Sequence, residues 1–199
     1  MARNVFISFR FSDGHRYKEM LANRFDAFCD TIDCSEDQDR SRFSEATIKN
    51  YLYGKLRRSS VTIVLLTPSA IDHRKDLWGR YDDWMYDEIR YSLENRENNR
   101  TNGLIAVYTP EAEPYIIERH PNSQVLTIRD VDNLFRKNMM NVKSEYKKNP
   151  TPNVYDADFD SYCSLVPFDT FTSNIGKYID LAIEKRDAIY KYIIRTRLQ

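Results

Sequence analysis

The 199-residue sequence lacks several features that would assign it to common functional classes. Its 30 basic and 30 acidic side chains cancel, which argues against bulk attraction to nucleic acid or to a membrane surface. No apolar run is long enough to span a bilayer, and the six residues between Arg3 and Arg10 are too few for a signal-peptide core. We therefore expect a cytoplasmic protein.

Cysteine and histidine are too sparse and too scattered for a metal centre. The three cysteines show no CxxC or zinc spacing, and the three histidines form no HExxH or similar pattern. An odd number of cysteines without a secretion signal suits free thiols in a reducing compartment. We expect no metal ion and no bound cofactor. These residues are Cys29, Cys34, Cys163, His15, His73 and His120.

Three glycine-containing fingerprints are also missing. Without GxGxxG the chain is not an ordinary dinucleotide dehydrogenase, and without GxxxxGK[ST] it is not a P-loop NTPase. Without GxSxG the α/β-hydrolase class is excluded as well.

The apolar runs that are present predict a parallel β-sheet. Ser60–Pro68 and Leu104–Tyr108 are apolar at almost every position, which is typical of strands covered on both faces. Weaker strands are expected at Asn4–Phe9, Asp30–Ser35 and Gln124–Ile128. Helical patterns separate them, over about His15–Phe28, from Ser44 to Arg58, and over about Asp76–Glu97. This alternation predicts an α/β fold with a five-stranded sheet in the flavodoxin-like order 2-1-3-4-5 and helices on both faces.

The domain organisation follows from the absence of a flexible linker. We expect one domain over residues 1–199, with a core at about 4–130 and a C-terminal extension, 131–199, packed on it. Arg129–Asn149 should be helical in part, and Asn149–Phe168 reads as an irregular segment rich in proline and aromatic residues. Thr170–Arg195 has the apolar spacing of one long helix.

The helix expected at Asp76–Glu97 carries the main functional candidate. Trp84 and Glu88 are four residues apart, so they share one flank of the helix. A carboxylate at the border of the core, beside an indole, is suited to a cleft. A glutamate on a helix is more often solvated or paired, however, and Trp84 could equally pack in the core. The predicted buried stripe of this helix is Trp78, Tyr81, Met85, Ile89 and Leu93.

The first loop is the second candidate. Ser12 or Asp13 is expected to cap the following helix, which would place the loop between a strand end and a helix N-terminus. Ligands of parallel α/β sheets bind there, although an ordinary strand-to-helix turn is the alternative. The charge-dense stretch Glu36–Arg42 is expected to be a solvated surface or a recognition loop.

Three stretches in this order resemble those of TIR domains. They are Val5–Asp13 (VFISFRFSD), Ser59–Ser69 (SSVTIVLLTPS) and Trp84–Glu88 (WMYDE), the last resembling the Trp-x-x-x-Glu helix of TIR NADases. Together with the tail, they look most like bacterial TIR-like proteins of the Thoeris anti-phage sensor (ThsB) type. The chain departs from common TIR domains at Met85, where many carry cysteine, and in its longer, more charged loop after the second strand.

The resemblance implies an enzyme that consumes NAD as its substrate. Glu88 would act at the ribose, Phe9 and Trp84 would stack on rings, and Arg10, Ser12 and Asp13 would line the path of the pyrophosphate or ribose. The product would be a cyclic ADP-ribose isomer that activates a partner effector protein after a phage-derived trigger, and the chain could form homo-oligomers.

Two other functions remain open at this point. One is a non-enzymatic TIR scaffold that acts by self-association or by docking another TIR domain. The other is an enzyme similar to the nucleoside deoxyribosyltransferases, which also use a glutamate on a related sheet. A pure scaffold has no need of Glu88 beside Trp84, which favours the enzyme.

Overall fold

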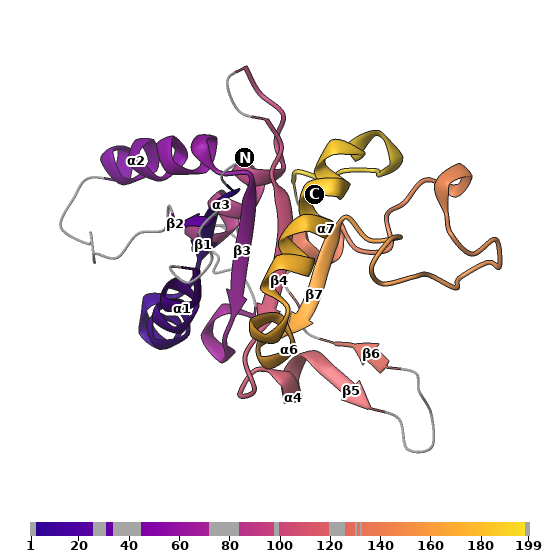
Figure 1. The fold of residues 1–199 in the computed structure, drawn as a ribbon, viewed down its shortest axis with the longest axis horizontal. Coiled ribbons are helices and arrows are strands. Elements are labelled where there is room, and N and C mark those ends of the chain that lie inside the picture. Colours follow the sequence, from indigo (N-terminus) through magenta and orange to yellow (C-terminus); the bar gives the residue numbers. More distant parts are fainter. Residues whose placement is uncertain are drawn as a thin grey trace, which may run out of the picture.

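The computed structural model describes residues 3–25, 31–33, 45–71, 84–97, 100–119, 126–129, 131 and 133–197. At its centre lies a parallel five-stranded sheet in the order β2-β1-β3-β4-β7 (Figure 1). Every residue of β3 and β4 is buried, as their nearly unbroken apolar runs predict. The strands are β1 (Arg3–Ser8), β2 (Thr31–Asp33), β3 (Val61–Leu66), β4 (Gly103–Tyr108) and β7 (Cys163–Pro167).

Helices cover both faces of this sheet, so the predicted α/β class is confirmed. One face packs against α1 (Phe11–Phe25), α6 (Phe168–Ser173) and α7 (Ile175–Asp187). The other face packs against α2 (Glu45–Arg58), α3 (Trp84–Leu93) and α5 (Asn133–Arg136). Alternate residues of β1, β3, β4 and β7 therefore enter the apolar layers on opposite faces of the sheet.

The first helix begins earlier than predicted. It starts at Phe11 rather than His15, and the Gly14 N–H already donates to the Arg10 carbonyl, four residues back, at 2.7 Å. Ser12 and Asp13 consequently lie inside the first turn, so the prediction that one of them is the cap is wrong. An acidic side chain is favourable in that turn, since it complements the helix dipole.

Helix α3 carries the expected buried stripe. Met85, Ile89 and Leu93 are all buried against the sheet, and the helix ends at Leu93, four residues before the predicted end. Trp78 and Tyr81 lie outside the described residues, as do the Glu36–Arg42 loop and all the cysteines and histidines except Cys163 and His15. Cys163 is a buried free thiol.

The fifth strand of the sheet is not the one that the sequence pattern predicts. The strand found within Gln124–Ile128 is β6 (Leu126–Ile128), which pairs antiparallel with β5 (Ile117–Arg119) in a separate ribbon after α4 (Glu113–Ile116). The place beside β4 belongs to β7, from the segment expected to be irregular. This strand has five residues and ends in proline, so its local pattern resembles a loop. Its burial beside β4 is what makes it a strand.

The C-terminal helix is divided, contrary to the prediction of one helix over Thr170–Arg195. Asn174 separates α6 from α7 with a φ of −140°, and its side-chain amide donates to the Thr170 carbonyl at 3.1 Å. Asparagine competes in this way with the backbone bonds of a helix, which explains the break. A 3-10 turn at Ile189–Lys191 follows α7, while α5 and another such turn, Ser144–Tyr146, make 129–149 partly helical as expected. Among the described residues, none of the helices is both long and apolar enough to cross a membrane.

Candidate functional site

A buried pair of oxygen atoms joins the sheet to α3 at the carboxyl end of β1. The Ser8 hydroxyl donates to Oε2 of Glu88 across 2.5 Å. Ser8 is 1% exposed and Glu88 is 8% exposed, so the contact is almost completely removed from water. Glu88 is therefore more deeply placed than the border position that the sequence predicts. A distance of 2.5 Å is typical of a hydroxyl bound to an ionised carboxylate.

Strand alternation explains why Ser8 faces this helix. Val5 and Ile7 of β1 pack on the α1 side, whereas Phe6 packs with α2 and α3 on the other side. Ser8, two residues after Phe6, shares its face. The sequence alone indicates this direction, because a serine two residues after Phe6 on a strand must point toward the same helical layer as Phe6.

The main chain of Glu88 is held by a second set of buried hydroxyls. The Ser92 hydroxyl donates to the Glu88 carbonyl at 2.8 Å and lies 2.8 Å from the Thr62 hydroxyl of β3. Since the single Ser92 proton is used on Glu88, Thr62 donates to Ser92, and Asn102 donates in turn to Thr62 at 3.2 Å. These bonds set the position of α3 along the sheet.

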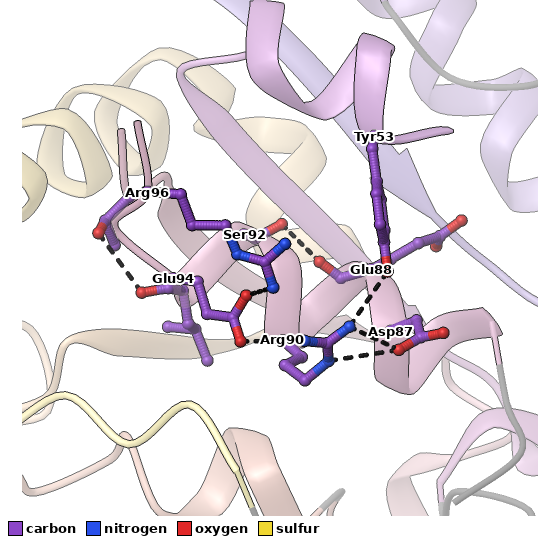
Figure 2. Close-up of polar contacts among 9 residues, drawn as sticks. Tyr53, Asp87, Glu88, Arg90, Ser92, Glu94 and Arg96 are labelled. Atoms are coloured by element: carbon purple, nitrogen blue, oxygen red, sulfur yellow. Dashed lines mark hydrogen bonds and ion pairs between the residues drawn. The ribbon is translucent and has the colours of Figure 1, made fainter. Parts of the chain in front are cut away.

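The opposite flank of α3 is bound to α2 through Arg90. Its guanidinium contacts Asp87 on the same helix and Glu94 just after the helix end, each at 3.0 Å, and donates to the Tyr53 hydroxyl of α2 at 3.1 Å (Figure 2). The Tyr53 ring stacks on Tyr91 with 3.9 Å between centroids. The helix that carries Glu88 is thus held from both sides.

Trp84 is the first residue of α3 and precedes Glu88 by about one helical turn. The residue is 36% exposed, so it is not a core residue. An aromatic surface at the helix start remains accessible for ring stacking.

The first turn of α1 contributes a different kind of contact. Asp13 accepts a hydrogen bond from the Thr67 hydroxyl at 2.7 Å and one from the Ser69 N–H at 3.0 Å, which ties the start of α1 to the end of β3. Burial alone would raise the pKa of Asp13, but the bonds from Thr67 and Ser69 outweigh it, and the pKa lies below its usual value. Phe9 and Arg10 are half-buried, and Ser12 is exposed.

A further hydrogen bond connects α1 to the loop that follows β4. The Tyr17 hydroxyl of α1 donates to both carboxylate oxygens of Glu111, at 2.6 and 2.7 Å, just after β4. Burial and this carboxylate raise the pKa of Tyr17 to about 12. Hydrogen bonds therefore connect α1 to the loops that follow β3 and β4 at the carboxyl end of the sheet.

The structure places the predicted site residues at this carboxyl edge but in two groups. Glu88 and Trp84 come from α3 on one face, and Phe9, Arg10, Ser12 and Asp13 come from the loop and helix that follow β1. The sequence interpretation missed Ser8 and Thr67, whose hydroxyls donate to the carboxylates of Glu88 and Asp13. Within the described part of the chain, no three His, Cys, Asp or Glu side chains gather as a metal site requires.

The sheet order, the two helical layers and the position of α3 after β3 are those expected of a TIR-like domain. The family model for the TIR-like domain of the Thoeris protein ThsB matches residues 6–114, more than half of the chain. The chain belongs to this family, which places it in the context of Thoeris anti-phage defence.

Proposed function

We propose that this protein is an NAD-consuming enzyme that cleaves the bond between nicotinamide and ribose, with Glu88 as the catalytic carboxylate. The main support is the position of Glu88, whose carboxylate lies at the carboxyl edge of a parallel sheet and is held by Ser8 in a nearly water-free contact. Ligands of open α/β sheets bind at this edge. Family membership supports the same proposal.

The proposed reaction begins with heterolysis of the glycosidic bond. The electron pair of that bond passes to the ring nitrogen of nicotinamide, which leaves as a neutral base, and positive charge develops on the anomeric carbon. A carboxylate beside the ribose lowers the energy of this oxocarbenium-like state. Glu88 supplies that charge or holds the ribose hydroxyls.

The second step determines the product. A hydroxyl of the same ADP-ribosyl group forms the new bond to the anomeric carbon and releases its proton, which gives a cyclic ADP-ribose isomer. Attack by water would give linear ADP-ribose. Exclusion of water favours cyclisation, and the low exposure of Glu88 and Ser8 is consistent with a dry site.

The other candidate residues take supporting roles in this proposal. The exposed indole of Trp84 and the ring of Phe9 would stack on planar groups of NAD, and Arg10 and Ser12 would line the pyrophosphate or ribose path. Asp13, whose two oxygens accept from Thr67 and Ser69, would hold the start of α1 in place beside the ribose. NAD is the substrate, and the product would activate an effector protein once a phage-derived trigger, and assembly with further copies, complete the site.

The test is nicotinamide release from NAD by the full chain, measured with purified protein and in infected cells. Glu88→Gln should reduce release by at least about a hundredfold, because it removes the charge and keeps the shape. Mass spectrometry of the product separates a cyclic isomer from linear ADP-ribose.

Asp87→Asn is the matched control, since Asp87 lies on the same helical turn as Glu88 but its carboxylate contacts Arg90. It should keep most of the activity. Equal release by Glu88→Gln and the unaltered protein, or no release in either setting, would overturn the enzymatic proposal and leave an adaptor that acts by self-association.

A further inference from the structure

The Ser8 hydroxyl has a role that the reaction above does not use. We propose that Ser8 is a positioning residue, whose buried hydrogen bond keeps the Glu88 carboxylate ionised and holds it in its reactive orientation. This inference rests on the proposed function and assigns a second residue to the same site.

The geometry makes Ser8 a rigid donor. Its main chain lies within the sheet, where β1 pairs with β3 and Ser8 aligns with Val64. Its side chain is 1% exposed, so the hydroxyl has little freedom to turn away. The glutamate side chain has three rotatable bonds, and ordering it costs conformational entropy. A donor fixed on a strand provides that ordering before substrate arrives.

The apolar surroundings make the Ser8 hydrogen bond important for the charge of the Glu88 carboxylate as well as for its orientation. Glu88 lies on the helix whose neighbouring positions Met85 and Ile89 are buried in the apolar core. Burial disfavours an ionised carboxylate, whereas a hydrogen bond donated to the ionised form favours it. The 2.5 Å bond from Ser8 acts in this second sense.

A purely structural role would give a different result from a positioning role. Ser92 provides the comparison, because its hydroxyl is equally buried but donates to the Glu88 carbonyl rather than to the carboxylate. Loss of either hydroxyl should weaken the attachment of α3 to the sheet. Only loss of the Ser8 hydroxyl should change the protonation of the reactive group.

The experiment measures kcat, KM for NAD and the pH dependence of nicotinamide release for Ser8→Ala and Ser92→Ala, with the full chain under conditions where the unaltered protein turns over NAD. Ser8→Ala should lower kcat by at least about tenfold with a change in KM below about threefold. The acidic limb of its pH profile should move to higher pH, since a carboxylate that lacks its donor protonates more readily. Ser92→Ala should leave that limb in place.

Ser8→Cys extends the test to a side chain of similar shape with a weak donor. Its kcat and its acidic limb should lie between those of the unaltered protein and Ser8→Ala. It replaces the alanine variant in the test if that variant fails to fold. An active protein whose Ser8 variants keep the original acidic limb and kcat would overturn the inference and leave the proposed function standing. No turnover by the unaltered protein in any setting overturns the proposed function, and this inference with it.

Discussion

Two buried ionisable side chains, Glu88 and Lys185, meet different surroundings. Glu88 receives a short bond from Ser8, whereas the Lys185 ammonium is 3% exposed and donates to the Ser164 hydroxyl at 2.9 Å. Burial lowers the pKa of Lys185 to about 8, because removal from water disfavours the charged form. At neutral pH the folded protein therefore keeps a charge in its interior at a cost in stability.

This cost predicts a stabilising substitution. Lys185→Met should raise the free energy of unfolding at pH 7 by up to about 3 kcal/mol, since it replaces a buried charge by an apolar side chain of similar length. The pKa of Lys185 is about 10.5 in the unfolded chain and about 8 in the folded chain, so the unfolded state binds more protons between these pH values. The gain should therefore shrink as the pH rises from about 8 to 10.5.

Urea unfolding of both proteins at pH 7, 9 and 10.5 checks this expectation. A gain that is the same at all three pH values would show that packing, not charge burial, is responsible. A loss of stability at pH 7 would show that the bond to Ser164 outweighs the cost of the buried charge.

At the scale of elements, helix α7 approaches the sheet very closely at Gly103. A Cβ atom at this first residue of β4 would lie 2.5 Å from the Ala182 carbonyl oxygen of α7. Main-chain atoms cannot move aside as a flexible side chain can. The missing side chain of Gly103 is therefore what lets α7 lie directly on the central strands.

Gly103→Ala should destabilise the protein by about 1–3 kcal/mol, because α7 must move away from β4. Gly54→Ala is the matched substitution, since nothing lies within 4 Å of a Cβ at that position of α2. It should stabilise the protein by about 0.5–1 kcal/mol through helix propensity. Thermal unfolding of the two variants should shift in opposite directions, and a shift in the same direction would contradict this account of α7.

At the scale of the whole molecule, the C-terminal third completes the central sheet. It supplies the edge strand β7 and the helices α6 and α7, which lie over β4 and β7 (Figure 1). The buried Tyr162 hydroxyl donates to the Asn102 carbonyl at 2.7 Å, just before β4. The Asn138 side chain donates to the carbonyl of Arg195 and accepts from its N–H, which anchors the C-terminal end.

A chain that ends at residue 130 should consequently fail to fold cooperatively. It would expose the outer edge of β4 and the apolar face that α6 and α7 cover, and an uncovered apolar surface of this kind does not sustain a unique packed state. Circular dichroism melts and amide NMR dispersion distinguish the outcomes. A sharp transition with dispersed resonances would show instead that residues 1–130 are sufficient.

Patterns within short segments were enough to predict a large part of this architecture. β3 and β4 are recognisable because a strand covered on both faces must be apolar throughout, and the buried stripe of α3 because Met85, Ile89 and Leu93 follow the helical period. The position of Glu88 near the sheet followed from the same periodicity.

Other features depend on partners that are distant in the sequence. β6 was recognisable as a strand, but its pairing with β5 rather than β4 was not, because hydrogen bonding to a neighbour leaves no mark on local alternation. β7 resembles a loop in the sequence, because five residues that end in Pro167 are too few to show a clear strand alternation.

The amino-acid order by itself determined the α/β class, the first four strands of the sheet and the helix that bears Glu88. The tertiary structure alone decided which strand lies beside β4, how deeply Glu88 is buried and that Ser8, eighty residues away, donates to its carboxylate. The reason is physical: periodicity reports which side of an element is apolar, whereas a hydrogen bond between distant residues exists only once the packed layers bring the two atoms together.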